Sequence, residues 1–421
     1  MKYFVFGYFG FKNFGDEFLC KKVIEDIKSV DENAFFFVWT GDEDFTRKFL
    51  NRNDVYTVNR FSLSETIKAI KSSDIVVLAG GGIIQEHYPI NIENLFRDFG
   101  QGIASYSIPA LIGKILDKKV FYWAIGHGPV LSEEGISFSK WFYSLADAIT
   151  VRDENSFNFI KYINDNVYLD TDPLLDYNFE NLNVEKQTNF TALEGSNLVF
   201  SIRRWFNNEE LINTSESALL KLLDRHEDLN VTLLPFDLSL DVDILKVLAE
   251  KIVKKGDRYK NRVKFIVPEN LYEIVDIVRS SDFFVGMRLH SLILAVKLYK
   301  PFLGISYDSK TEIFMNKINK DFIRIQNLND ILLYEKIEEM MAYPCIVDIP
   351  KVVYKTPEIF KEFLNSNNKR NYSYLPANEE IQNSYLKTLE LDTQYLIDSF
   401  IKKEKELSSN VVNLHQQIQA L

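Results

Sequence analysis

The stretch from Ser280 to Lys310 constrains the fold more than any other part of the chain, because it reads as strand, turn, helix and strand in that order. An apolar run over 283–285 ends at Gly286, an apolar helical pattern covers 292–296, and a second apolar run covers 302–305. In a βαβ unit of this kind the two strands lie parallel and are joined by a right-handed crossover. This part of the chain is therefore expected to fold around a parallel sheet.

Charged residues follow both strands of this unit. Arg288 and His290 come after the first strand, and Lys310 ends the turn that follows the second. Open α/β sheets bind ligands at the carboxyl ends of their strands, so these three residues are expected to share one edge of a cleft. Arg288 and His290 also lie at a helix N-terminus, where free N–H groups and the helix dipole favour anions. The pattern predicts a site for a phosphorylated or carboxylated compound.

The alternation of strands and helices continues over most of the first 350 residues, and its two halves resemble each other. The triplet Ser-Ser-Asp precedes an apolar strand at 72–74 and again at 280–282. The first of these strands ends in three glycines at 80–82, which would let a ligand or a neighbouring domain approach the main chain. This repetition predicts an α/β protein with two Rossmann-like domains facing across a cleft.

The expected domain boundaries follow from changes in this pattern. Residues 1–177 form the first Rossmann-like domain, and 178–196 form a linker in which polar residues increase and periodicity fades. Residues 197–368 form the second domain with the anion site. A helical tail over 369–421 carries apolar residues in sevens, which indicates an imperfect coiled coil that pairs with another copy, a partner or the body of the protein. The pattern runs to the last residue, as in a truncated chain.

Composition excludes several classes of protein. The net charge of −11 and the absence of a Lys/Arg cluster argue against a nucleic-acid partner. No apolar run approaches the roughly 18 residues of a membrane span, and glycines and charges interrupt the N-terminus too early for a signal peptide. The two cysteines fit neither a disulfide framework nor a zinc pattern, and no histidine–carboxylate spacing requires a metal. We expect a cytoplasmic protein with at most peripheral contact at the inner face of the membrane.

Two further segments carry candidate site residues. Arg152 follows the apolar strand 148–151 beside a helix start, as Arg288 does, although it could also be a surface residue paired with a neighbouring carboxylate. The glycine-bearing loop 7–17 lies between a strand and a helix and matches neither a dinucleotide fingerprint nor a P-loop. Its acidic end has the alternative explanation of favourable charge at a helix N-terminus.

Two arginines, one lysine and one histidine are thus expected in one cleft. Arginine recognises carboxylate and phosphate in a bidentate manner, and lysine adds a point charge. Histidine can transfer a proton near neutral pH. The set predicts an enzyme acting on a small phosphorylated acid, whereas the absence of a Gly-x-Ser-x-Gly elbow gives no support to a hydrolase triad.

Five collinear segments together resemble the polysaccharide pyruvyl transferase family: Gly7–Glu17, Gly80–Gly82, Val151–Ser156, Gly286–His290 and Ser306–Lys310. The helical tail lies outside the resemblance, and His127 stands where the family implies a non-ionisable residue. The resemblance implies a GT-B-like fold. It also implies transfer of the pyruvyl group of phosphoenolpyruvate to two hydroxyls of a sugar in a surface-polysaccharide precursor, with release of phosphate. The product is a cyclic pyruvate ketal, and no cofactor is needed besides phosphoenolpyruvate as co-substrate.

The resemblance also assigns roles to residues. Catalysis is expected from His290, Arg152 and Lys310, and phosphoenolpyruvate is expected to bind Arg152, Arg288, Leu289, His290 and Lys310. His290 is favoured as the acid that protonates the methylene carbon. The sugar acceptor, carried on a lipid or a nucleotide, is expected on the N-terminal side at Asn13, Asp16, Glu17, Gly81, Gly82, Gln85 and His87.

Two other functions are compatible with the same residues. A GT-B-like glycosyltransferase would share the architecture and would use Arg and Lys for the phosphates of a nucleotide sugar. A non-catalytic scaffold would use the tail to recruit a partner or a second copy.

Overall fold

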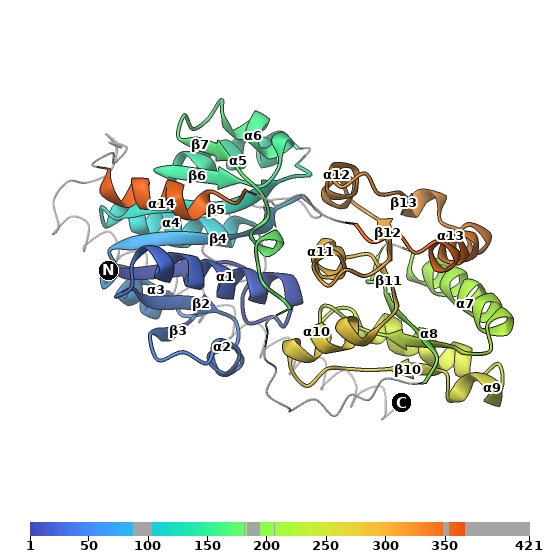
Figure 1. Ribbon diagram of the computed structural model, residues 1–421. Helices are drawn as coiled ribbons and strands as arrows, with labels where there is room; N and C mark the ends of the chain where they lie inside the picture. The colour runs from blue at the N-terminus through green and yellow to red at the C-terminus, as the bar shows by residue number, and fades with distance from the viewer. Residues whose placement is uncertain are drawn as a thin grey trace, which may run out of the picture.

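The computed structural model describes residues 1–86, 103–130, 132–180, 182, 194–205, 207–347 and 353–366. In these ranges two α/β domains lie side by side, each built on a parallel sheet (Figure 1). The prediction of two Rossmann-like domains is therefore confirmed. The tail expected over 369–421 lies outside the described residues.

The first domain is built on a sheet with the strand order β3-β2-β1-β4-β5-β6-β7, so the order reverses between β1 and β4. Its strands are β1 (Lys2–Phe6), β2 (Phe35–Thr40), β3 (Val55–Asn59), β4 (Ile75–Ile84), β5 (Lys119–His127), β6 (Ala148–Val151) and β7 (Val167–Leu169). Its helices are α1 (Phe14–Val30), α2 (Glu43–Leu50), α3 (Leu63–Lys71), α4 (Ser107–Ile115), α5 (Glu133–Ser144) and α6 (Glu154–Ile160), with 3₁₀ turns η2 (Ile103–Tyr106) and η3 (Pro173–Leu175).

The second domain has the strand order β10-β9-β8-β11-β12-β13, which reverses between β8 and β11. Its strands are β8 (Ser196–Ser201), β9 (Leu229–Leu233), β10 (Val263–Phe265), β11 (Phe283–Gly286), β12 (Phe302–Ser306) and β13 (Phe322–Arg324). The helices are α7 (Asn208–Arg225), α8 (Val242–Val253), α9 (Asp257–Lys260), α10 (Leu271–Ser280), α11 (Leu289–Lys297), α12 (Ser309–Lys317) and α13 (Asp330–Ala342), with the 3₁₀ turn η4 (Ile325–Asn327). Among the described residues no helix combines the length and apolarity needed to cross a membrane.

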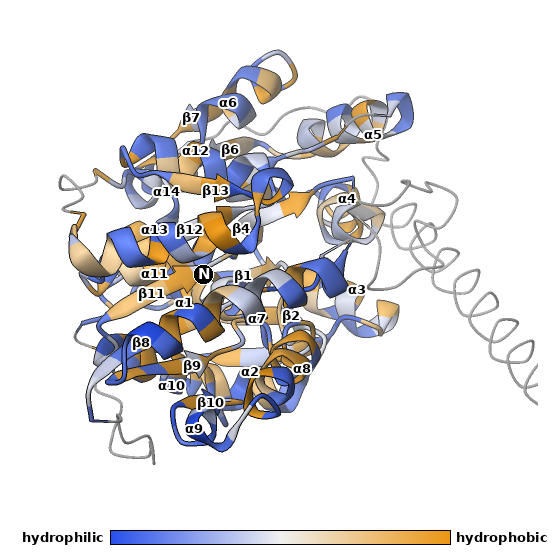
Figure 2. Ribbon diagram, turned by 90° about the vertical axis from the view of Figure 1, so that its right-hand side faces the viewer, coloured by the Kyte–Doolittle hydropathy of each residue, from blue (hydrophilic) through white to orange (hydrophobic). Residues whose placement is uncertain are grey.

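The apolar strands form the centre of each domain because side chains alternate between the two faces of a strand. In β1, Tyr3 and Val5 join the core that contains α1, whereas Phe4 and Phe6 join the core under α3 and α4. Figure 2 shows mostly apolar strands such as β4 and β11, while the helices around them also carry polar residues. Burial on both faces explains why these strands read as continuous apolar runs.

The repeated Ser-Ser-Asp triplet has the same structural role in both domains. Asp74 Oδ2 accepts a 2.8 Å hydrogen bond from the backbone N–H of Lys2, and Asp282 Oδ2 accepts one of 2.8 Å from the N–H of Asn197. In each domain the aspartate N–H also donates to the carbonyl of that partner. The triplet thus connects the first strand of each domain by hydrogen bonds to the neighbouring strand at which the strand order reverses.

One of the apolar cores, the one that contains α1, is shared by the two domains. Phe14 of α1 packs edge-on against Phe236 with 5.2 Å between ring centroids, and Phe18 lies 5.6 Å from Tyr272. The backbone N–H of Phe14 also donates a 2.8 Å hydrogen bond to the carbonyl of Phe236. The amino end of α1, which carries the glycine-bearing loop, is therefore fixed directly against the second domain.

The helix α14 (Thr356–Asn365) returns to the first domain (Figure 1). Phe360 is fully buried, and its ring lies 4.9 Å from that of Phe121 and 5.0 Å from that of Trp123. Burying one such side chain stabilises a fold by about 1.5–3 kcal/mol. The sequence placed this helix within the second domain, because periodicity does not tell which sheet an amphipathic helix will cover.

Candidate active site

The candidate site lies where the carboxyl ends of the two sheets meet. Lys310, which follows β12 of the second domain, donates a 3.2 Å hydrogen bond to the carbonyl of Gly82 near the end of β4 in the first. β4 borders the switch point of the first sheet, and β11, next to β12, borders that of the second. Ligand sites of open α/β sheets form at such switch points. The structure therefore brings strand-end residues of both domains to one place, as the sequence predicted.

Asp172 joins Arg152 to His290. Arg152 Nη1 donates a 2.7 Å hydrogen bond to Asp172 Oδ2, and His290 Nε2 lies 3.4 Å from the same oxygen without hydrogen-bond alignment. Burial raises the pKa of Asp172, but the charges of His290 and Arg152 outweigh it and hold that pKa below its ordinary value. An ionised carboxylate therefore orients Arg152 and places a negative charge beside the His290 ring.

Sequence reasoning missed Asp172, although a signal for it exists. It follows strand β7 at its carboxyl end, much as Arg152 follows β6. The sequence pattern does not predict the short strand β7, because its three residues are too few to show a periodicity.

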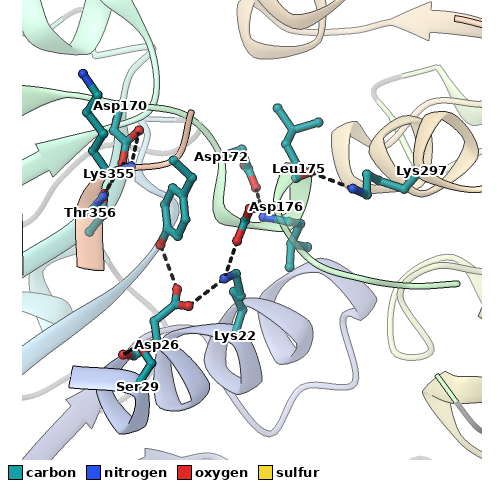
Figure 3. A network of polar contacts seen from close by, with 12 residues as sticks. Lys22, Asp26, Ser29, Asp170, Asp172, Leu175, Asp176, Lys297, Lys355 and Thr356 are labelled. Carbon is teal, nitrogen blue, oxygen red and sulfur yellow. Dashed lines mark hydrogen bonds and ion pairs between the residues drawn. The ribbon is translucent and has the colours of Figure 1, made fainter. Parts of the chain in front are cut away.

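The segment that carries Asp172 is fixed at several points (Figure 3). Asp170 accepts hydrogen bonds from the backbone N–H and hydroxyl of Thr356, at 2.6 and 2.5 Å, and so anchors the start of α14. Asp176 pairs with Lys22 of α1 at 2.8 Å, and Lys297 of α11 donates to the carbonyl of Leu175 at 2.9 Å. Contacts from both domains thus hold the site carboxylate in position.

Lys310 and Arg152 both lie against Gly82, two residues before the end of β4. A Cβ added to Gly82 would come within 2.3 Å of Lys310 Nζ and 3.1 Å of Arg152 Nη2, so only glycine leaves room for both cations. Burial lowers the pKa of Lys310 to about 8. The charge of Asp308 opposes this shift, and the charge of Arg152 reinforces it. Lys310 is accordingly a cation at neutral pH with little solvent compensation, a state that favours an anionic ligand.

Asp16 faces this cluster from the first turn of α1. A Cβ on Gly81, whose φ is +89°, would lie 3.3 Å from Asp16 Oδ1, so the backbone of Gly81 approaches the carboxylate closely. Burial raises the pKa of Asp16 to about 6, although the charge of His290 opposes the shift. A carboxylate that titrates near neutral pH is suited to accept a proton.

Arg288 was expected to bind the donor but is already paired. Its guanidinium donates to both carboxylate oxygens of Asp241, at 2.6 and 2.7 Å, and lies 3.1 Å from Asp237 Oδ2. Burial would lower the pKa of Arg288, but these two carboxylates raise it overall. The geometry gives Arg288 the role of an interdomain anchor, since Asp237 also accepts a 3.1 Å hydrogen bond from Asn13 Nδ2.

Two of the residues expected to bind the acceptor instead make hydrogen bonds that stabilise the fold. Asn13 caps α1 by accepting from the backbone N–H groups of Gly15 and Asp16, at 3.0 and 3.3 Å. Glu17 is fully buried, and its Oε1 accepts from three amides of the loop at 2.8, 3.1 and 3.2 Å. Both side chains stabilise the glycine-bearing loop and do not face an open site. Neither supports the expected contact with an acceptor.

Of the other residues singled out in the sequence, one lies at the site, one packs in its surroundings and one lies outside the described residues. Gln85 donates to the carbonyl of Gly82, so it lies beside the β4 glycines. His127 is stacked on Phe159 at 3.9 Å, and burial lowers its pKa to about 4, so it is a neutral packing residue. His87 lies outside the described residues.

A pocket adjoins the Arg152–Asp172 pair and includes Leu289 in its wall. Three basic side chains, two carboxylates and several apolar side chains share the lining, which is formed by Arg152, Asp153, Thr171, Asp172, Leu175, Leu289, Ile293, Lys310, Ile313, Phe314 and Lys317. Such a mixture suits a small anion with an apolar part. In the described ranges no three His, Cys, Asp or Glu side chains gather as metal ligands.

Comparisons with known proteins identify a sequence family and a set of similar folds. The profile of the family described as polysaccharide pyruvyl transferase matches residues 13–309, more than half of the 421 residues. None of the curated proteins matches the chain.

Solved structures, among them UDP-GlcNAc 2-epimerases, share the architecture. The S. aureus MnaA–UDP co-structure has 11% identity and a TM-score of 0.61, with 89% of this chain and 99% of that chain covered. A UDP-GlcNAc 2-epimerase from Methanocaldococcus jannaschii has 13% identity and a TM-score of 0.62, covering 87% and 99%. One from Neisseria meningitidis, bound to UDP-GlcNAc, has 15% identity and a TM-score of 0.58, covering 87% and 100%. At these identities the likeness establishes the GT-B-like fold alone.

Proposed function

The chain belongs to the polysaccharide pyruvyl transferase family, and we propose that it transfers the pyruvyl group of phosphoenolpyruvate to two hydroxyls of a sugar acceptor. The products are a cyclic pyruvate ketal on a surface-polysaccharide precursor and phosphate. The observation that carries the proposal is the convergence of Arg152, Lys310 and His290, from both domains, beside a glycine-lined strand end.

The charges of the site suit the donor. Phosphoenolpyruvate carries a phosphate and a carboxylate, and Arg152 and Lys310 offer a planar fork and a point charge to them. Asp172 holds Arg152 by one nitrogen, Nη1, while Nη2 faces Gly82. Asp172 thus orients the guanidinium and leaves its other edge for the substrate.

The chemistry needs one proton donor and one acceptor. His290 donates a proton to C3 of phosphoenolpyruvate, and the electrons of the C2=C3 bond form the new C–H bond while C2 becomes oxocarbenium-like. A sugar hydroxyl attacks C2 and loses its proton to Asp16. The bond from C2 to the phosphate oxygen then breaks, and a second hydroxyl closes the ketal. The two hydroxyl protons balance the one added to C3 and the one carried away on hydrogen phosphate.

Preorganised positive charge contributes most where phosphate departs, since charge develops there on the leaving oxygen. Lys310 and Arg152 are fixed against Gly82 and need no rearrangement to meet that charge. No cofactor takes part in this scheme. The proposal places the reaction in the cytoplasm, where phosphoenolpyruvate is supplied, with the acceptor on a lipid at the inner face of the membrane or on a nucleotide.

The test is to incubate the protein with phosphoenolpyruvate and a panel of lipid-linked and nucleotide-linked sugars, following phosphate release and product mass. The expected product is heavier than the acceptor by one pyruvyl ketal, and His290→Gln should abolish it. Consumption of a nucleotide sugar without any use of phosphoenolpyruvate would instead identify a glycosyltransferase. If the protein binds phosphoenolpyruvate or a nucleotide sugar but consumes neither, the result favours a scaffold role.

A further inference from the structure

A second cationic cluster lies on the edge of the second domain that faces the site. Arg203 follows β8, and its Nη1 donates a 2.8 Å hydrogen bond to the hydroxyl of Tyr307, which follows β12. The guanidinium carbon lies 4.6 Å from the centre of the Tyr307 ring and 5.6 Å from that of Trp205. The two rings pack together with centroids 4.7 Å apart. The cluster of Arg203, Trp205 and Tyr307 is a guanidinium framed by aromatic faces.

No carboxylate in the described ranges compensates the charge of Arg203. Among the described residues no carboxylate lies within ion-pair distance of it, and its Nε is buried without a hydrogen-bond partner. Arg288, by contrast, is bound by two carboxylates. A partly buried guanidinium that lacks an acid is costly to hold unless a ligand supplies the negative charge.

The position of the cluster points to the same conclusion. The strand order of the second sheet reverses between β8 and β11, and Arg203 stands just beyond β8 at that switch point. Tyr307 precedes Lys310 by three residues, so this cluster and the donor-binding cations flank one loop. The charges of Arg203 and Arg288 both act on the Tyr307 hydroxyl. A ligand held here would extend from the reacting centre.

From these contacts we infer that Arg203, with Trp205 and Tyr307, forms a second anion subsite that binds the diphosphate through which the acceptor sugar is attached to its carrier. The inference rests on the proposed function for the identity of the acceptor. The donor has two anionic groups, and Arg152 and Lys310 already offer charge to them. A further guanidinium beside aromatic faces fits a phosphoryl group with a bulky substituent.

Calorimetric titration with inorganic pyrophosphate, in the presence of saturating phosphoenolpyruvate, tests the subsite without relying on turnover. Pyrophosphate should bind the wild-type protein, and Arg203→Ala should weaken its affinity about tenfold to a hundredfold, the loss typical of a hydrogen bond to a charged group. Arg204→Ala is the matched control, because Arg204 is the next residue, is 57% exposed and already pairs with Asp243 at 3.3 Å. It should change the affinity less than about twofold.

Two further measurements make the result specific. Arg203→Lys keeps the charge but not the planar fork, so it should give an intermediate affinity, and unchanged phosphoenolpyruvate binding shows that each variant is folded. Titration with UDP and with farnesyl diphosphate tells whether the carrier is a nucleotide or a lipid. The compound that resembles the carrier should bind more tightly than pyrophosphate, and Arg203→Ala should weaken its affinity by the same factor as that of pyrophosphate.

The proposal is overturned if pyrophosphate does not bind the wild type, if Arg203→Ala binds it normally, or if phosphoenolpyruvate displaces it. These outcomes are separable from failure of the proposed function. Pyruvyl transfer with normal diphosphate binding in Arg203→Ala would refute only the subsite. Arg203-dependent diphosphate binding without any pyruvyl transfer would refute only the activity.

Discussion

Gly15 packs directly against the side chain of His290: a Cβ added to Gly15 would come within 1.7 Å of His290 Nδ1. The two residues belong to different domains, one in the first turn of α1 and the other in the first turn of α11. The backbone of one domain is thus in contact with the histidine of the other that we propose as the proton donor. The assembled site depends on the domains remaining in this contact.

Gly15→Ala should displace the His290 ring, reducing phosphate release more than tenfold and costing about 1–3 kcal/mol of stability, typical of an overpacked site. Assays of phosphate release and thermal unfolding give both values. In the double variant Gly15→Ala/His290→Ala the closest contacts disappear, so stability should recover in part while activity stays absent. Equal stability losses with and without the ring would show that the contact is not the cause.

Asp172→Asn should lower kcat about tenfold to a hundredfold, since an amide keeps the shape of the carboxylate but no longer balances the charges of Arg152 and His290. Asp176→Asn is a suitable control because Asp176 lies on the same segment but pairs with Lys22 and is 45% exposed at its side chain. Steady-state kinetics of the two variants should differ clearly. Comparable losses in both would point to the segment as a whole.

The pH profile of kcat/KM for phosphoenolpyruvate should have two limbs. It should rise as pH increases through about 6, where Asp16 loses its proton, and fall through about 8, where Lys310 loses its charge. Arg remains charged over this range, so Lys310→Arg should retain anion binding and move the alkaline limb upward. An alkaline limb at the same pH in that variant would assign it to another group.

Glu17 should make stability depend on pH. Burial raises the pKa of Glu17 from 4.5 to about 8, against the pull of the loop amides, so the folded state holds a proton that the unfolded state has lost. Its contribution is full below pH 4.5, declines as pH rises, and is lost once pH passes about 8. Glu17→Gln removes this dependence, so its melting temperature should gain on the wild type between pH 5 and 8. A constant difference would contradict the assignment.

Arg288→Ala should act mainly on stability. Its loss leaves Asp241 and Asp237 buried without a counter-charge, at a cost of about 3–5 kcal/mol. The double variant Arg288→Met/Asp241→Asn should recover much of that loss, as chemical denaturation can measure. Arg152→Ala should instead raise KM for phosphoenolpyruvate more than tenfold. A large rise in KM for Arg288→Ala with unchanged stability would return Arg288 to the donor site.

The α/β class, the two domains and the strand-end location of Arg152, His290 and Lys310 could be predicted from the sequence. These features are local: apolar runs specify buried strands, and the residue after a strand must lie at the sheet edge. The Ser-Ser-Asp repeat was likewise visible, and it proved to mark the same hydrogen bonds to Lys2 and Asn197.

Which of these residues lie together could be seen only in the folded chain. Arg288 and His290 are two positions apart, yet one is bound by Asp241 of the second domain and the other lies against Gly15 and Asp172 of the first. Asp172 and Arg203 likewise gain their roles from partners far away in the chain. Pairing energies and pKa shifts depend on burial and on charges brought close by folding, and no spacing in the sequence encodes them.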